Sequence, residues 1–231
     1  MDQAVILLSG GLDSSTLLHY VRKTLDCRTL YALTFCYGQK HVREIECAKW
    51  QAQALAVAEH QVLDLTALGN LSVGASALTD THLPVPDFAA LSPGQRDQPP
   101  TYVPHRNMIL LALAAAYAET KGMADVFYGA QVQDSYGYWD CTPEFLDRMN
   151  AVLALNRRGA VSVHAPFIRM SKREILEIGR QLGVDYAHTW TCYRGLEAAC
   201  GTCPACVERL GAFRRLGLSD PLVYEAPPIR A

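Results

Sequence analysis

Short apolar runs alternate with longer amphipathic stretches over the first two thirds of the chain. The short runs predict buried strands at residues 4–8, 29–35, 61–65, 126–129 and 161–164. The longer stretches repeat apolar residues every three or four positions and predict helices at 14–23, 41–59, 105–121 and 143–155. This alternation predicts an α/β fold, a doubly wound parallel sheet of about five strands with helices on both faces.

Two segments interrupt this alternation. Residues 66–104 hold six of the twelve prolines and show no clear period, which is typical of a lid, a binding loop or a disordered segment. In the C-terminal third, Ser171 and Glu174 have capping-box spacing, which predicts the start of a helix, and a last helix is expected at 204–216. We therefore expect an α/β domain at 1–170, including the loop 66–104, and a C-terminal helical region at 171–231.

Composition narrows the classes of partner. The chain has 231 residues, which suits one sizeable domain or a domain with an appendage. Its 21 Lys plus Arg against 23 Asp plus Glu give no globally basic surface, so direct nucleic-acid binding is not expected. The longest apolar run, 108–118, is short of the roughly 20 residues that span a membrane. No basic stretch precedes the first apolar run, so we expect no signal peptide and a cytoplasmic protein.

The first predicted strand runs into Ser9, Gly10 and Gly11, and a predicted helix follows. Glycines allow close approach of the backbone to a ligand, and a helix N-terminus presents free N–H groups at a positive dipole end. Ser14 and Ser15 add hydroxyl donors. The stretch predicts a phosphate site, although neither the Walker A nor the G-x-G-x-x-G pattern is present. The alternative interpretation is a glycine-rich turn with a helix cap.

The second and fourth predicted strands also end in polar and glycine-rich sequence. These ends are "TFCYGQ" at 34–39 and "YGAQVQD" at 128–134. Because the carboxyl ends of parallel strands meet at one edge of the sheet, we expect both to face the same crevice as Ser9–Gly11.

Four cysteines cluster in "TCYRGLEAACGTCPAC". Cys192, Cys200, Cys203 and Cys206 follow spacings of x7, x2 and x2, which suit a tetrahedral thiolate site for zinc. Four sulfur ligands leave no open coordination position, so such a zinc ion would be structural. An iron–sulfur cluster, a redox dithiol or idle thiols are the alternatives.

A family resemblance connects these features. "SGGLDS" resembles the loop of the N-type ATP pyrophosphatases, and "LSGGLDSSTLL", "TFCYGQKH", "YVPHRNMILL", "SKREI" and "TWTCYRGLEAACGTCPACVER" together resemble the 7-cyano-7-deazaguanine synthases of the queuosine pathway. The match spans nearly the whole chain. It implies an adenine nucleotide α-hydrolase-like fold and an ATP-dependent ligase that converts 7-carboxy-7-deazaguanine and ammonia to 7-cyano-7-deazaguanine. Adenylated intermediates, AMP and pyrophosphate, Mg²⁺ with ATP, one structural Zn²⁺ per subunit and a homodimer are implied as well.

The resemblance and the chemistry together suggest residue roles. Asp13 would help to place Mg²⁺ or cap a helix, Lys172 would touch a phosphate or stay solvated, and Arg106 would bind an anionic group or form a structural ion pair. We take these three as the catalytic candidates. The expected ATP-binding residues are Leu8, Ser9, Gly10, Gly11, Leu12, Asp13, Ser14, Ser15, Thr34, Gly38, Gln39 and Gly129. The expected substrate-binding residues are Tyr37, Arg106, Asn107, Asp134, Tyr138 and Asp140.

The chain departs from the usual family pattern near the expected base pocket. Trp139 stands where the family has proline, Thr142 where it has arginine, and His105 where glycine is common. Two other readings remain open. One is another N-type ATP pyrophosphatase that modifies a tRNA base or forms an amide. The other is a non-catalytic ATP-binding or zinc-knuckle module.

Overall fold

One parallel sheet organises the part of the chain that the computed structural model describes, residues 1–132 and 137–225. It has five strands in the order β3-β2-β1-β4-β5, and every pairing is parallel. The strands are β1 (Gln3–Leu7), β2 (Thr29–Cys36), β3 (Glu59–Asp64), β4 (Asp125–Phe127) and β5 (Ser162–His164). The strand order reverses at β1, and ligands of such sheets bind beyond the carboxyl ends of the strands at this point.

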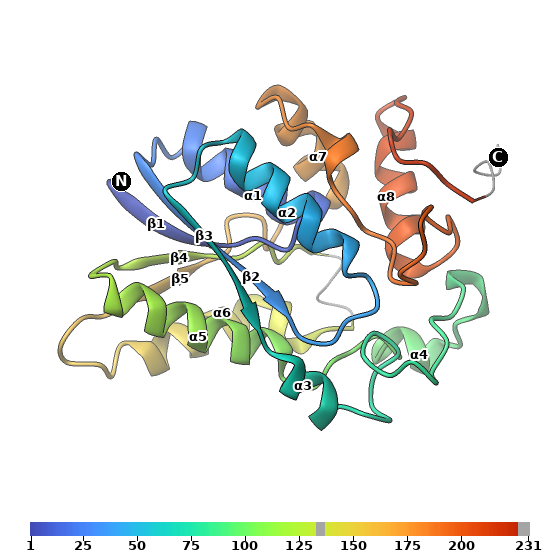
Figure 1. The fold of residues 1–231 in the computed structure, drawn as a ribbon, viewed down its shortest axis with the longest axis horizontal. Coiled ribbons are helices and arrows are strands. Elements are labelled where there is room, and N and C mark those ends of the chain that lie inside the picture. Colours follow the sequence, from blue (N-terminus) through green and yellow to red (C-terminus); the bar gives the residue numbers. More distant parts are fainter. Residues whose placement is uncertain (133–136, 226–231) are drawn as a thin grey trace.

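Helices cover both faces of the sheet, as Figure 1 shows. On one face, α1 (Leu12–Lys23), α2 (Arg43–Ala54), α7 (Lys172–Gln181) and α8 (Pro204–Arg215) share one apolar core with the sheet. On the other face, α5 (Arg106–Thr120) and α6 (Pro143–Leu153) close a second core. The predicted doubly wound α/β fold is confirmed. Since α7 and α8 share their core with α1, the C-terminal helices pack directly on the α/β unit.

One predicted element boundary is wrong. The helix expected at 41–59 ends as α2 at Ala54, and β3 begins at Glu59. Ala56 has a positive φ of 47°, a left-handed conformation that ends the helix and turns the chain towards the sheet. Glycine is the usual signal for this turn, and the sequence has none here. The other predicted helices and strands are present, with ends shifted by a few residues.

The proline-rich segment 66–104 folds into short helices joined by turns. It contains α3 (Thr66–Leu71), the 3₁₀ turn η1 (Phe88–Ala90) and α4 (Pro93–Asp97). The N–H of Phe88 donates to the carbonyl of Thr202 at 2.9 Å, and the N–H of Ala77 donates to the carbonyl of Pro100 at 2.7 Å. The segment is thereby held against the C-terminal region. In the described part of the chain, no helix is long and apolar enough to cross a membrane.

The C-terminal third begins and ends on strong local interactions. The predicted capping box is present: Ser171 Oγ accepts from the N–H of Glu174 at 3.4 Å, and Glu174 Oε2 accepts from the N–H of Ser171 at 2.8 Å. Arg209 in α8 is fully buried and donates to both oxygens of Asp220, at 2.7 and 3.0 Å. The short turns η3 (Trp139–Cys141) and η4 (Tyr186–His188) precede α6 and the cysteine-rich segment.

Candidate active site

The sequence Ser9–Gly11, called here the Ser-Gly-Gly loop, links β1 to α1. Helix α1 begins at Leu12 with Gly11 as its N-cap and without a side-chain cap, so its first N–H groups are available to an anion. The hydroxyls of Ser9 and Ser14 lie 2.9 Å apart, and Ser9 Oγ accepts from the N–H of Gly11 at 3.3 Å. Two hydroxyls and a helix N-terminus therefore converge on one point, as expected for a phosphate site.

The two glycines of this loop serve different purposes. Gly10 has a φ of +82°, and a Cβ there would lie 2.1 Å from the carbonyl oxygen of Glu44 and 2.6 Å from the nitrogen of Ala48. Gly10 thus lets the loop pass against the backbone of α2. Gly11 borders the cavity described next. Gly129, after β4, lets the chain approach the first turn of α1, because its Cβ would lie 3.3 Å from the nitrogen of Ser14.

A cavity of about 640 Å³ lies at the carboxyl ends of the strands. The Ser-Gly-Gly loop, the ends of β2 and β4, the start of α5, the start of α7 and α8 all contribute to its wall. The sequence-predicted residues that line it are Leu8, Ser9, Gly11, Leu12, Asp13, Ser14, Tyr37, Arg106, Asn107, Gly129, Tyr138 and Lys172. The structure therefore brings the expected ATP and substrate residues together around one space.

Several predicted ATP-binding residues stand behind this wall. Ser15 is fully buried in α1, and its hydroxyl has no hydrogen-bond partner in the described structure. Thr34 donates its hydroxyl to the carbonyl of Leu8 and so fastens β2 to the end of β1. Gln39 accepts from the N–H of Tyr37 at 2.7 Å and shapes the turn after β2, in which Gly38 has a φ of +85°. Their direct contact with ATP stays a prediction.

Lys172 forms a buried ion cluster at the N-terminus of α7. Its Nζ lies 3.3 Å from Asp13 Oδ2 and 3.2 Å from Glu208 Oε2. Asp13 Oδ1 has no hydrogen-bond partner among the described residues. Burial raises the pKa of Asp13, and the charge of Lys172 opposes this shift. Two catalytic candidates therefore meet beside the Ser-Gly-Gly loop, and Glu208, which the sequence did not single out, joins them.

Arg106, the first residue of α5, lies against Tyr37. Its Nη1 donates to the hydroxyl oxygen of Tyr37 at 3.0 Å, and its guanidinium carbon lies 5.5 Å from the centre of the tyrosine ring. Burial raises the pKa of Tyr37 to about 12, so the phenol is neutral at physiological pH. The remaining donors of the guanidinium fork can address an anion in the cavity.

Asp140 is buried and stabilises the first turn of α5, which borders the cavity. It is 2 % exposed, and its Oδ2 accepts from the N–H of Asn107 at 3.1 Å. It thereby serves the start of α5, where His105 provides no side-chain cap. Burial raises the pKa of Asp140, and Arg106 opposes the shift. Asp140 is not among the residues that line the cavity, and its contact with substrate stays a prediction. The other predicted carboxylate, Asp134, lies outside the described residues.

The cavity also has residues that the sequence reasoning did not assign. His41 and Glu44 come from the start of α2 and the turn before it, and their Nε2 and Oε1 atoms lie 3.3 Å apart. Trp190 and Tyr193 lie on either side of Cys192, the first of the four clustered cysteines. The stretch "TFCYGQKH" with the following "EIECAK" belongs to the blocks that carry the family resemblance, and this was the available signal for His41 and Glu44.

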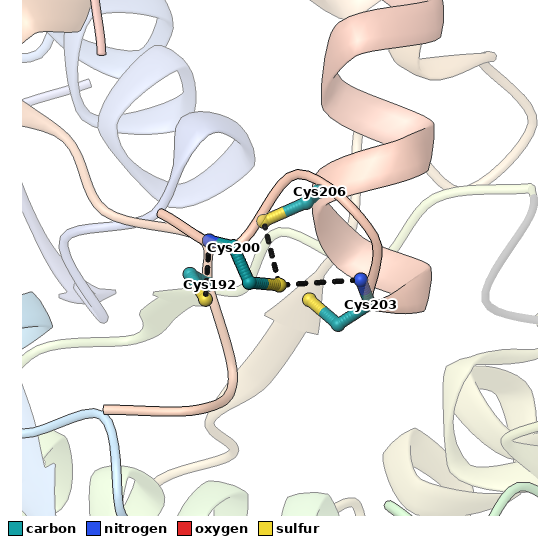
Figure 2. A group of neighbouring side chains, drawn as sticks. All are labelled: Cys192, Cys200, Cys203 and Cys206. Carbon is teal, nitrogen blue, oxygen red and sulfur yellow. Dashed lines mark hydrogen bonds between the residues drawn. The ribbon is translucent and has the colours of Figure 1, made fainter. Parts of the chain in front are cut away.

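The four predicted metal ligands converge, as Figure 2 shows. The sulfur atoms of Cys192, Cys200, Cys203 and Cys206 are buried and lie within 4.8 Å of one another. Cys192 Sγ accepts from the N–H of Cys200 at 3.4 Å, and Cys200 Sγ accepts from the N–H of Cys203 at 3.3 Å. Four thiols with backbone donors to sulfur form a donor set that fits a tetrahedral metal ion such as zinc.

The cysteine cluster is tied to the Ser-Gly-Gly loop through the chain that leads into it. The N–H of Trp190 donates to the carbonyl of Gly10 at 2.9 Å, and the indole N–H of Trp190 donates to the carbonyl of Cys192 at 3.0 Å. On the other side, Ala199 pairs with Tyr224 in an isolated parallel bridge. The segment that carries the four candidate metal ligands therefore contacts the Ser-Gly-Gly loop, the candidate phosphate site.

Comparison with known proteins gives a full-length match. The profile of the family described as "Queuosine biosynthesis protein QueC" matches residues 3–217. The chain is 42% identical over 224 residues to "7-cyano-7-deazaguanine synthase 1" of Colwellia psychrerythraea, covering 97% of this chain and 99% of that protein. It is 45% identical over 231 residues to "7-cyano-7-deazaguanine synthase" of Clostridium kluyveri, again covering 97% of this chain and 99% of that protein.

More distant solved structures share the fold. NMN synthetase from Francisella tularensis superposes with a TM-score of 0.51 at 14% identity, covering 94% of this chain and 72% of that one. The U34-tRNA thiolase NcsA from Methanococcus maripaludis superposes with a TM-score of 0.50 at 14% identity, covering 93% of this chain and 66% of that one. At this identity the likeness concerns the fold alone.

Proposed function

Because the chain belongs to the QueC family of queuosine biosynthesis proteins, we propose that it is a 7-cyano-7-deazaguanine synthase. In this activity an ATP-dependent ligase converts 7-carboxy-7-deazaguanine and ammonia to the nitrile. The observation that carries the proposal is identity above 40% along nearly the whole length of relatives that bear this name. The cavity with the Ser-Gly-Gly loop at its wall supports it.

The reaction has two rounds with one kind of activation. In the first, the substrate carboxylate attacks ATP, pyrophosphate leaves, and ammonia displaces AMP from the acyl adenylate to give the amide. In the second, the amide oxygen is adenylated in the same way, and loss of AMP with the nitrogen-bound protons gives the nitrile. Each round turns a poor leaving oxygen into a good one. One site with one phosphate-binding loop suffices for both.

The departing pyrophosphate would be held at the N-terminus of α1. The free N–H groups of its first turn and the hydroxyls of Ser9 and Ser14 are the donors. Lys172 supplies a fixed positive charge in a buried position, where charge stabilisation is stronger than in water. Mg²⁺ that arrives with ATP would be held by Asp13, whose Oδ1 is unpaired, and would neutralise charge on the phosphates.

The acceptor would lie between the ends of β2 and β4. Arg106 is placed to address the substrate carboxylate, because its planar fork matches two oxygens. The rings of Tyr37 and Tyr138 border the cavity and suit a flat base. Asn107 borders it too, and Asp140 fixes its backbone. Asp134 as a partner of the base edge stays a prediction.

The remaining expectations concern the whole protein. Zinc is the metal that fits the four-cysteine site, with a structural role and one ion per subunit. We expect a homodimer, which size-exclusion chromatography with light scattering would test. We expect no direct nucleic-acid partner, since the net charge is −2. We expect a cytoplasmic location, where ATP for both rounds is present.

A product assay tests the proposal directly. Purified protein is incubated with ATP, Mg²⁺, ammonium and 7-carboxy-7-deazaguanine, and the products are analysed by mass spectrometry. We expect the nitrile together with AMP and pyrophosphate. Amide as the only product would mean that the second adenylation is missing. The absence of substrate-dependent AMP would contradict the proposal.

A matched pair of variants links the assay to the site. Lys172→Gln removes the buried charge beside Asp13, and Arg173→Gln removes the next, exposed charge of the same helix turn. We expect Lys172→Gln to lower substrate-dependent AMP formation by about 100-fold or more, as for loss of a preorganised charge in other active sites. Arg173→Gln should leave the rate within about twofold, as is usual for exposed charges.

A further inference from the structure

A buried carboxylate stands at the cavity wall beside the Ser-Gly-Gly loop. Glu44 lies in the first turn of α2 and is 9% exposed, and its backbone oxygen packs against Gly10. His41, in the turn before the helix, is 3% exposed. Both residues border the cavity. The proposed handling of ATP and of the deazapurine uses neither of them.

Only one oxygen of this carboxylate is occupied by the protein. Glu44 Oε1 accepts from Gln39 Nε2 at 3.0 Å and lies 3.3 Å from His41 Nε2. Among the described residues, Oε2 has neither a hydrogen bond nor an ion pair, and it is not among the fully buried polar atoms. Oε2 is therefore the atom that a molecule in the cavity can reach. Gln39 fixes the orientation of the carboxylate through Oε1, since the Gln39 side chain also donates to the carbonyl of Phe35.

The two positively charged side chains of the described site, Lys172 and Arg106, have partners other than Glu44. Lys172 lies between Asp13 and Glu208, and Arg106 donates to the hydroxyl of Tyr37. One aromatic ring lies near this pair: the ring of Tyr193, which also borders the cavity, lies 5.4 Å from that of His41, the partner of Glu44 Oε1. A buried carboxylate without a permanent cation is costly, and ring faces attract positive charge. The position thus favours a small cation that enters with the reaction.

We propose that Glu44 binds the ammonium ion that supplies the nitrogen and takes its first proton, with His41 as a positioning residue. This rests on the proposed ligase activity, in which ammonium is the small cation among the substrates. An ammonium ion has four N–H donors, so it can donate to Oε2 and still lie against ring faces. It would then lie in the same cavity as the adenylated carbon, because Glu44 and the Ser-Gly-Gly loop both border that cavity.

Atoms, charge and electron pairs balance in the proposed step. Ammonium gives one proton to Glu44 Oε2 and becomes ammonia with a free electron pair. This pair forms the bond from nitrogen to the acyl carbon, and the bond from that carbon to the AMP oxygen breaks with its electrons going to AMP. The second proton passes from nitrogen to the departing AMP phosphate. The products are the amide, protonated AMP and a protonated Glu44, which returns its proton to water in the open cavity.

Glu44→Gln tests this role because the substitution keeps the shape and removes the charge. The glutamine oxygen can still accept from Gln39. The amide-forming rate is measured against ammonium concentration at fixed pH. We expect the KM for ammonium to rise about 10- to 100-fold, the range for loss of one charge-assisted hydrogen bond. Substrate-dependent exchange of pyrophosphate into ATP, which reports adenylation alone, should stay within about twofold, as expected for uniform binding effects confined to ammonium.

Hydroxylamine supplies a readout that a structural role would not move. It is mostly uncharged at neutral pH, so it needs no cation site and no proton acceptor to attack an acyl adenylate. Hydroxamate formation by Glu44→Gln should therefore remain near the wild-type rate while amide formation from ammonium falls. Glu46→Gln is the matched control, because Glu46 lies in the same helix turn with an exposed side chain paired to Lys49. It should change neither reaction.

The outcomes separate the two proposals. An unchanged KM for ammonium in Glu44→Gln would overturn the inference, and so would an equal loss of pyrophosphate exchange, hydroxamate and amide. Failure of the ligase proposal has a different signature, since the wild-type protein itself would then show no pyrophosphate exchange that depends on 7-carboxy-7-deazaguanine.

Discussion

The folded structure around Asp13 disfavours the charged form of its carboxylate. Burial raises its pKa above the ordinary 3.8, and the attraction of Lys172 offsets this only in part. Below the unfolded-state pKa, both folded and unfolded chains carry the proton, and the group is neutral for stability. As the pH rises past that value, the unfolded chain loses its proton first. Stability is then lost progressively until the pH passes the folded-state pKa.

Asp13→Asn should gain stability relative to the wild type as the pH rises from about 3 to 7.5, since the folded-state pKa of this aspartate is raised above its ordinary value of 3.8. The free energy of unfolding of both proteins is measured in urea at the two pH values. The variant should also lose adenylation activity. A difference in stability that does not change with pH would show that the raised pKa does not hold.

Two departures from the family pattern contact each other. His105 adopts a left-handed conformation with φ of 56°, which glycine adopts without strain. Its ring lies 5.5 Å from that of Trp139 in an edge-to-face arrangement, and the indole N–H of Trp139 donates to the hydroxyl of Tyr102 at 2.7 Å. The two substitutions thus form one local change beside the cavity, with Trp139 side-on to Phe145 as well.

A double-mutant cycle measures this coupling. We expect His105→Ala and Trp139→Ala to be non-additive by about 0.5–1.5 kcal/mol, the range for an aromatic pair beyond its buried area. Free energies of unfolding of the four proteins give the coupling. A sum of single effects that equals the double effect would mean that the contact between the two rings contributes no coupling energy.

Among single residues, the sequence identified the charged candidates of the site better than the residues that position them. Asp13, Arg106 and Lys172 border one cavity as expected, because each lies next to a readable motif. The contact of Asp140 with the base stays a prediction, and the sequence did not indicate that its carboxylate accepts from the N–H of Asn107, 33 positions away. Local patterns carry no information on such distant pairings. Thr142, where the family has arginine, caps α6 by accepting from Phe145.

At the scale of elements, Gly10 sets how closely the Ser-Gly-Gly loop approaches α2. Gly10 and Gly74 have nearly equal positive φ values of +82° and +79°, but only Gly10 has backbone atoms where a Cβ would stand. Gly10→Ala and Gly74→Ala therefore share the cost of the left-handed conformation, about 1–2 kcal/mol. Only the first has to displace the backbone of a helix.

We expect Gly10→Ala to lose several kcal/mol more stability than Gly74→Ala, and to lose ATP binding with it. Thermal unfolding and nucleotide titration of the two variants give both quantities. Overpacking against backbone costs typically about 1–3 kcal/mol or more, in addition to the conformational term. Equal losses in the two variants would mean that α2 moves away freely.

Element types were predictable where burial repeats with a clear period. The inner strands β1, β2 and β4 are largely apolar because helices cover the sheet on both faces, whereas the edge strands β3 and β5 carry more polar residues. The end of α2 was missed because Ala56 turns the chain without a glycine signal. The short helices within 66–104 were missed as well, since they are held by distant backbone bonds such as Phe88 to Thr202. These bonds depend on the folded C-terminal region.

At the scale of the whole molecule, the cysteine cluster and the Ser-Gly-Gly loop are connected by hydrogen bonds through Trp190. Trp190 donates its backbone N–H to the carbonyl of Gly10 and its indole N–H to the carbonyl of Cys192, so the cysteine-rich segment lies directly on the Ser-Gly-Gly loop. Arg43 lies 4.5 Å from the centre of the Trp190 ring and adds a contact from α2. A change in the order of the cysteine segment therefore reaches ATP binding through a short path.

Removal of the metal should loosen the C-terminal segment and weaken ATP binding together. We expect chelator treatment, or Cys200→Ser, to increase hydrogen exchange over 189–206 and to weaken ATP binding by about tenfold, the effect of losing roughly 1.4 kcal/mol. Cys27→Ser, a buried thiol outside the cluster, is the control. Restoration of both properties by added Zn²⁺ would complete the test. Unchanged ATP binding in the metal-free protein would contradict the coupling.

The contact between Trp190 and Gly10 has a consequence for how the protein is made. The loop at residues 9–11 is translated well before Lys172, Trp190 and Glu208, which complete the wall of the cavity. At about 5–20 residues per second, roughly 10 s or more pass between the two events. During this interval the nascent chain has the Ser-Gly-Gly loop but lacks the later residues that border the same cavity. The complete cavity can therefore form only after α8 has been translated.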